Sequence, residues 1–135
     1  MKTLFLLAAL AVTQLLSAQL RLPSFLANDM VLQQQKVNRI WGWANAQQLV
    51  TVTFKSKIYS TFANSNGEWQ VFLEPAVAGS AGTMLVKAGT EKIELNNILI
   101  GEVWVCSGQS NMEWKMKQCP EIYKDELKTA SNDNI

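Results

Sequence analysis

Alternation of apolar and polar side chains from about residue 20 to residue 100 constrains the fold of this chain most. Two clear stripes are Val50-x-Val52-x-Phe54 and Trp69-x-Val71-x-Leu73, although Phe72 interrupts the polar face of the second. The other apolar members are Ile58, Phe62, Met84, Val86, Ala88, Ile93 and Leu95. Because successive side chains of a strand point to opposite faces, this period of two predicts strands with one buried and one solvated face.

Turn residues divide this region into short segments. Residues 64–67 read Asn-Ser-Asn-Gly, and Asn-Gly takes the positive φ of a tight hairpin turn easily. Residues 75–82 predict a longer connection, and Gly89-Thr90 predicts a third turn. Six or seven short strands at this spacing predict an antiparallel β-sandwich over residues 19–98.

The pattern changes near Ile98. Residues 98–100 lead into Val103-Trp-Val-Cys106, an apolar run without alternation that predicts a strand buried on both faces of an α/β sheet. Gly108 permits a sharp turn, and a helix is predicted to begin just after Ser110. A second helix is predicted to open at Pro120, with its apolar face at Tyr123, Leu127 and Ala130, and to end at residues 131–134.

One strand and two helices cannot cover both faces of a sheet, and only 35 residues follow Ile100. We therefore expect residues 99–135 to be the beginning of an α/β domain, so that the chain is truncated.

The first 18 residues have the composition of a secretory signal peptide. Lys2 precedes a thirteen-residue segment, residues 4–16, that is apolar except for Thr13 and Gln14, and small residues follow. A membrane-spanning helix needs about 20 residues. Cleavage after Ala18 is therefore favoured over a membrane anchor, and the mature chain is predicted to be secreted or periplasmic.

Composition excludes several classes of protein. Apolar residues make up 48% of the chain and charged residues 17%, which predicts a folded core rather than disorder. The net charge is +1 without a basic stripe, so neither nucleic acid nor an anionic membrane surface is an expected partner. No His/Cys cluster has metal-ligand spacing.

Export makes a disulfide between Cys106 and Cys119 possible, but two free thiols, with Cys106 buried, are equally compatible.

Ser110 is the candidate nucleophile. A hydroxyl on a strand-to-helix turn is exposed at the edge of a sheet, where backbone N–H groups at the helix start can stabilise the oxyanion formed during attack on an ester. Gly108 would let the backbone fold tightly and a substrate approach. The pattern Ser110-x-x-Glu113 also fits a capping box, in which the serine only caps the helix.

Two segments carry a resemblance to a known family. Gly101-Glu-Val-Trp, followed by Ser107-Gly-Gln-Ser-Asn-Met-Glu-Trp114, resembles the first conserved block of the sialate O-acetylesterase-like carbohydrate esterases, in the SGNH hydrolase superfamily. Residues 23–33 and 40–44 resemble the β domain that precedes the esterase domain in that family, so the likeness extends from Leu20 to Met116. It implies that residues 99–135 begin an SGNH-type, flavodoxin-like domain.

The resemblance also implies a function and a site. The activity would be deacetylation of an acetylated carbohydrate, without a metal or an organic cofactor. Ser110 would be the nucleophile and its backbone N–H an oxyanion donor, with Gly108, Gln109 and Asn111 shaping the turn. The C-terminal remainder of the esterase domain would be expected in cis.

The departure from the family is its histidine base, because this chain contains no histidine. Lys115 and Lys117 are the nearest substitutes, and solvation on a helix surface is the favoured interpretation of both. A serine without a base is a weak nucleophile, so the isolated chain is predicted to be inactive.

Two interpretations other than an esterase stay open. In a carbohydrate-binding β-sandwich, Trp41, Trp43 and Trp69 would stack on sugars, although packing inside the sandwich is favoured for these aromatic residues. In an accessory domain, the only partner would be the absent esterase domain, and Val103-Trp-Val105 would be exposed. Trp104 and Trp114 are expected to line or underlie the Ser110 pocket.

Overall fold

The computed structural model describes residues 19–131. The predicted signal peptide, residues 1–18, and the predicted helix end at residues 132–134 lie outside this range. The described chain divides into two compact units, and the division falls between Val103 and Trp104. The three-part division predicted from the sequence stays a prediction.

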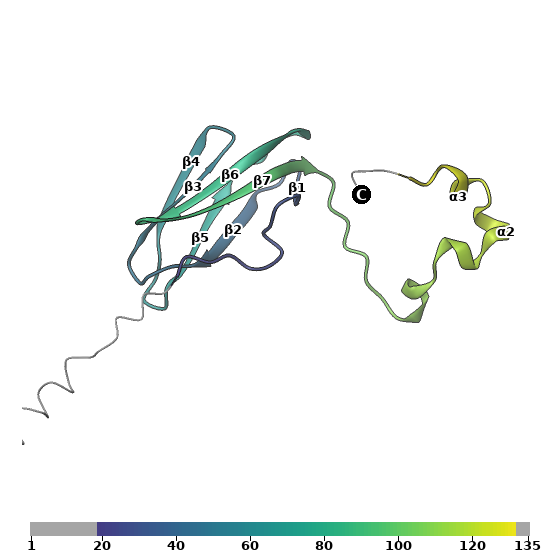
Figure 1. Ribbon diagram of the computed structural model, residues 1–135, viewed down its shortest axis with the longest axis horizontal. Coiled ribbons are helices and arrows are strands. Elements are labelled where there is room, and N and C mark those ends of the chain that lie inside the picture. The colour runs from purple at the N-terminus through teal and green to yellow at the C-terminus, as the bar shows by residue number, and fades with distance from the viewer. Residues whose placement is uncertain (1–18, 132–135) are drawn as a thin grey trace, which may run out of the picture. The chain divides into compact units, whose positions relative to one another are not determined.

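The first unit consists of seven strands in two sheets (Figure 1). The larger sheet has the order β1-β7-β6-β3-β4, and the smaller sheet pairs β2 with β5. The strands are β1 (Val31–Gln33), β2 (Asn38–Trp43), β3 (Leu49–Phe54), β4 (Lys57–Phe62), β5 (Glu68–Leu73), β6 (Gly79–Ala88) and β7 (Glu91–Gly101). All pairs are antiparallel except β1 with β7, which is parallel.

The alternating stripes form the core, as predicted. Val50 and Val52 on β3 and Met84 and Val86 on β6 are fully buried, while Thr51 and Thr53, which alternate with the β3 apolar residues, are only half-buried. Both sheets contribute to this single cluster of buried side chains, the smaller one through Ile40, Trp69, Val71 and Leu73. The face shared by Ile58 and Phe62 on β4 is the exposed one.

The predicted antiparallel sandwich is not confirmed. The structure confirms a strand-rich unit, but its sheets have five and two strands, and the parallel pairing of β1 with β7 departs from the prediction. The connection predicted over residues 75–82 is partly strand, because β6 begins at Gly79. Irregular register at Gly79 and Gly82 explains why this segment lacks a clear alternation.

The Asn64–Gly67 turn links the two sheets. Gly67 has a φ of 79°, as its sequence predicts, and its N–H donates to the Asn64 carbonyl at 2.9 Å. The Asn64 side-chain oxygen accepts from the N–H groups of Asn66 and Glu68, each at 2.9 Å. The turn is not a hairpin turn within one sheet, because β4 pairs with β3 and β5 pairs with β2.

The second unit contains only short helices. They are the 3₁₀ helices η1 (Ser110–Glu113) and η2 (Met116–Gln118) and the α-helices α2 (Pro120–Tyr123) and α3 (Glu126–Thr129). Pro120 opens α2, as predicted, but one continuous helix through Ala130 is not formed. No residue from Trp104 to Ser131 is buried.

The strand predicted at Val103–Cys106 is not formed. Residues 102–108 have no regular structure, and Val105 is 90% exposed. A strand needs a neighbour for its backbone hydrogen bonds, and none of the seven strands of the described chain pairs with this segment. Residues 98–100 instead complete β7, with Ile98 buried.

In the described range, 19–131, no helix has the length and apolar character needed to cross a membrane.

Candidate functional site

Ser110 is the first residue of η1. Its side chain is exposed, and its hydroxyl makes no hydrogen bond to any residue between 19 and 131. The residue therefore lies at a helix start, as predicted, and its oxygen is open to solvent. It does not follow a strand directly, since residues 102–109 separate it from β7.

The capping-box interpretation is wrong for this structure. The residue at the cap position is Gln109, and no side chain caps η1. The helix dipole also contributes little, because η1 has only four residues and a macrodipole needs several aligned turns. Ser110 is therefore not explained by a capping role.

Backbone N–H groups are free next to the hydroxyl. The N–H of Met112 donates to the Gln109 carbonyl at 2.9 Å, and that of Trp114 to the Asn111 carbonyl at 3.4 Å. The N–H groups of Ser110 and Asn111 precede these bonds and have no acceptor in the described chain. They are the donors available to stabilise an oxyanion at Ser110.

Gly108 packs closely against Met112 near Ser110. A Cβ on Gly108 would lie 2.8 Å from Cγ of Met112. The role of this glycine is therefore steric, since positive φ is found only at Gly67 and Gly89 among the glycines described. The glycine leaves room for Met112 to fold back within the turn.

No basic side chain between residues 19 and 131 is hydrogen-bonded to the Ser110 hydroxyl. The chain has no histidine, and Lys115 and Lys117 are exposed. The backbone N–H of Lys115 donates to Gln118 Oε1 at 2.7 Å, which fixes the start of η2. The expected solvated role of both lysines fits this geometry.

A hollow of about 370 Å³ lies beside the candidate site. It is lined by Asn111, Trp114, Lys115, Met116, Cys119 and Tyr123. Of the predicted site residues only Asn111 lines it, together with Trp114, one of the two tryptophans expected there. Trp104 is 83% exposed and does not line this hollow.

The cysteines are free thiols. Cys106 is exposed and Cys119 is half-buried, so the interpretation of Cys106 as a buried apolar residue is wrong. Its exposure follows from the missing strand at residues 103–106. Among residues 19–131, no cluster of three His, Cys, Asp or Glu side chains could hold a metal ion.

Glu102 anchors the end of the strand unit. Its carboxylate accepts from Gln33 Nε2 at 2.9 Å and from Gln34 Nε2 at 2.6 Å. These two hydrogen bonds lower the pKa of Glu102 below its ordinary value of 4.5, and the bond from Gln33 has the larger effect. The carboxylate is therefore part of the scaffold and stays ionised at neutral pH.

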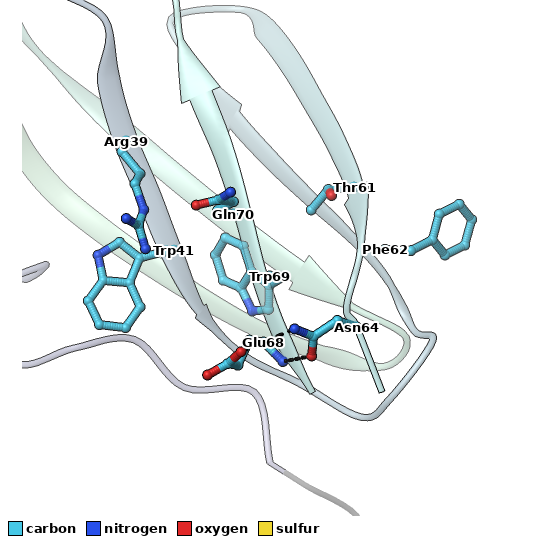
Figure 2. A pocket seen from close by; sticks show the side chains of 8 residues that line it. All are labelled: Arg39, Trp41, Thr61, Phe62, Asn64, Glu68, Trp69 and Gln70. Carbon is cyan, nitrogen blue, oxygen red and sulfur yellow. Dashed lines mark hydrogen bonds between the residues drawn. The ribbon is translucent and has the colours of Figure 1, made fainter. Parts of the chain in front are cut away.

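Sequence reasoning missed a set of polar residues around Trp41. Arg39, Glu68 and Gln70 line a second hollow with it, and Trp69 also lines this hollow (Figure 2). Burial was predicted for all three tryptophans, but only Trp69 is buried, while Trp41 and Trp43 are half-buried. The sequence signal for this hollow was the alternation Arg39-x-Trp41-x-Trp43, which places both tryptophans on the same strand face as an arginine.

The sequence of this chain is similar to those of known enzymes. No family model matches the chain. It is 32% identical to the sialate O-acetylesterase of Homo sapiens over 127 residues, covering 85% of this chain and 24% of the relative. The enzyme of the same name from Rattus norvegicus is also 32% identical, with 23% of its length covered. The chain thus spans about a quarter of the length of the curated relatives it matches.

A solved structure is similar as well. The crystal structure of a carbohydrate acetylesterase from Xanthomonas citri superimposes with a TM-score of 0.70 and 32% sequence identity. The match covers 74% of this chain and 23% of that protein.

Proposed function

We propose that this chain, for which the comparisons support a sialate O-acetylesterase-like esterase family, supplies the serine nucleophile of a carbohydrate O-acetylesterase. The observation that carries the proposal is the exposed, unbonded hydroxyl of Ser110 at the start of η1, beside two free backbone N–H groups. The names of the similar proteins, all acetylesterases, support ester hydrolysis as the reaction in which this hydroxyl would act.

The reaction proceeds through an acyl-enzyme. Ser110 Oγ attacks the carbonyl carbon of the acetyl group while a base removes its proton, and the N–H of Ser110 donates to the resulting oxyanion. The C–O bond to the sugar breaks, the sugar oxygen takes a proton, and acetyl-Ser110 remains. Water then releases acetate and restores the serine.

On this proposal, the base and the further oxyanion donors are residues other than those of this sequence, which includes no histidine. On this proposal residues 1–18 direct export and are cleaved after Ala18, and the enzyme acts in a secreted or periplasmic location. Its substrate is an acetylated carbohydrate, the class that the relatives' names indicate.

The first test uses the 135-residue chain by itself. We expect no hydrolysis of 4-nitrophenyl acetate above the rate of the Ser110→Ala variant, because loss of the base in a serine hydrolase costs on the order of 10⁶ in kcat. Turnover that disappears in the Ser110→Ala variant would contradict the proposed inactivity of the chain.

The second test extends the reading frame past the codon for Ile135 and expresses the longer product. If that product hydrolyses acetylated sugars, Ser110→Ala is expected to reduce kcat to background. Ser107→Ala, three residues away, is the matched control and should retain most of the activity. Equal activity in the Ser110→Ala variant would exclude this serine as the nucleophile.

A further inference from the structure

We propose that the hollow beside Trp41 binds a neutral pyranose sugar, at a site separate from Ser110. The hollow has a volume of about 400 Å³ and lies entirely within the strand unit (Figure 2). Its polar and aromatic lining includes Arg39, Trp41, Thr61, Asn64, Glu68 and Gln70. This proposal goes beyond the esterase function and does not depend on it.

The topology of the strand unit explains why a hollow forms here. β4 and β5 follow each other in the chain, but β4 is the last strand of the larger sheet and β5 belongs to the smaller one. No ladder of hydrogen bonds joins their edges beyond the Asn64–Gly67 turn. The side chains of both edges therefore line an open space.

Trp41 supplies an aromatic wall. Its ring contacts Trp43 edge-on with 5.1 Å between centroids and Phe25 at 6.2 Å. The Arg39 guanidinium lies 5.3 Å from the Trp41 ring centroid. These contacts hold the indole in place, so stacking a ligand on it costs little side-chain entropy.

Hydrogen-bonding groups surround this wall. Gln70 lies opposite Trp41 in the register of β2 and β5. Glu68 Oε2 accepts from Asn64 Nδ2 at 3.1 Å, which orients the carboxylate and leaves its second oxygen free to accept from hydroxyls. One cation, Arg39, and one anion, Glu68, line the hollow, so its net charge favours a neutral ligand.

Trp69 adds an independent sign of a ligand. It lines the hollow and is only 3% exposed, and its Nε1–H is buried without an acceptor among residues 19–131. A buried donor without an acceptor is costly and needs an explanation. Because this nitrogen is closed off from solvent, a hydroxyl oxygen of a bound sugar can satisfy the donor only if the indole moves on binding.

The combination favours a sugar over other ligands. An apolar molecule would make no hydrogen bond to the carboxylate and the amides that line the hollow, and an anion would face Glu68. A pyranose ring has apolar C–H faces suited to Trp41 and a rim of hydroxyl groups that both donate and accept. The polar groups of the hollow match that rim.

The test follows the indole N–H signals of the five tryptophans by ¹H–¹⁵N NMR of the 135-residue chain, assigned with Trp→Phe variants. Methyl β-D-glucoside, methyl β-D-galactoside and methyl β-D-xyloside are the neutral probes, and N-acetylneuraminic acid is the anionic one. We expect saturable, millimolar binding of at least one neutral probe that moves the Trp41 and Trp69 signals and leaves those of Trp104 and Trp114 unchanged.

Variants localise the binding. Trp41→Ala should lower the affinity for the neutral probe roughly tenfold or more, and Glu68→Gln should also lower it. Phe72→Ala, an exposed aromatic on β5 outside the hollow, and Ser110→Ala should leave the affinity unchanged. A conservative Trp41→Phe variant, expected to retain part of the affinity, separates stacking from loss of folding.

Three results would overturn the proposal. One is the absence of saturable shifts with all four probes, and another is binding of N-acetylneuraminic acid alone, which would assign the hollow to an acidic sugar. The third is an affinity unaffected by Trp41→Ala. Because Ser110→Ala is predicted to leave binding intact, these outcomes are independent of the esterase tests.

Discussion

Two apolar segments of similar composition have opposite fates in the two units of this chain. Val50 and Val52, on β3 of the strand unit, are fully buried, whereas Val103, the last residue of that unit, and Val105, in the second unit, are 46% and 90% exposed. Apolar composition therefore does not decide burial here. Burial requires a neighbouring element that accepts the backbone hydrogen bonds of the segment and covers its side chains.

The difference lies in what surrounds each segment. β3 pairs with β4 on one side and with β6 on the other, and the side chains of β2 and β5 join its core. Residues 102–108 pair with no strand of the described chain. The comparison predicts that the strand unit carries nearly all of the stability of the chain.

The sharpest test is amide hydrogen exchange along the chain. We expect amides of β3 and β6 to exchange at least about 10³-fold more slowly than those of residues 104–131, since core strands open only on global unfolding. Mass spectrometry of peptic fragments measures this difference. Comparable protection in the two regions would show that the second unit has stability of its own.

A pair of methionine substitutions should show the second-largest difference in stability between the two units. Met84 is fully buried and Met112 is 53% exposed. Met84→Ala is expected to lower the free energy of unfolding by about 2–5 kcal/mol, because it leaves a cavity, and Met112→Ala by less than about 0.5 kcal/mol. Urea denaturation followed by circular dichroism compares them, and equal losses would contradict the comparison.

A glycine pair tests close packing inside the strand unit. A Cβ on Gly42 would lie 2.3 Å from the carbonyl oxygen of Arg21, whose backbone exchanges two 3.0 Å hydrogen bonds with Trp43. Gly42→Ala should therefore cost about 1–3 kcal/mol of unfolding free energy. Gly79→Ala is the control, since no atom lies within 4 Å of its Cβ position. A wild-type melting temperature in the Gly42→Ala variant would show that the segment at Arg21 yields freely.

The smallest effect concerns pH at the junction of the units. Because the folded pKa of Glu102 is lowered, its stabilising contribution is present above the ordinary pKa of 4.5 and is lost as the pH falls through the folded value. Glu102→Gln should therefore lose less stability on acidification below about pH 5 than the wild type. Glu113→Gln, whose carboxylate has no partner in the described range, is the control. Parallel acid-stability curves for wild type and Glu102→Gln would contradict the prediction.

Local pattern identified most of the buried residues of the strand unit but not its strand pairing. The stripes at β3, β5 and β6 identify their buried residues because period two needs no knowledge of the partner strand. The parallel pairing of β1 with β7 and the assignment of β5 to a separate sheet depend on long-range pairing that no local pattern encodes. The same reason explains the wrong strand at residues 103–106.

The candidate sites differ in the same way. Ser110 was predicted as a site residue from its motif, and only its position at a helix start is borne out by the structure. Sequence kept open a sugar-stacking role for Trp41, Trp43 and Trp69, but it did not predict the hollow or its polar lining, because these depend on the approach of two sheet edges separated by a turn. The arginine in phase with Trp41 and Trp43 was the available local signal.

The parallel pairing of β1 with β7 also has a mechanical consequence. Gln34 N–H donates to the Gly101 carbonyl at 2.8 Å, and Val103 N–H donates to Gln33 Oε1 at 2.8 Å, so the exit of β7 is tied to β1. A force that pulls the chain outward beyond Val103 acts along β7 and loads its ladders with β1 and β6 in shear. Many hydrogen bonds then share the tension at once, and the strand unit serves as a firm anchor for the chain that follows it.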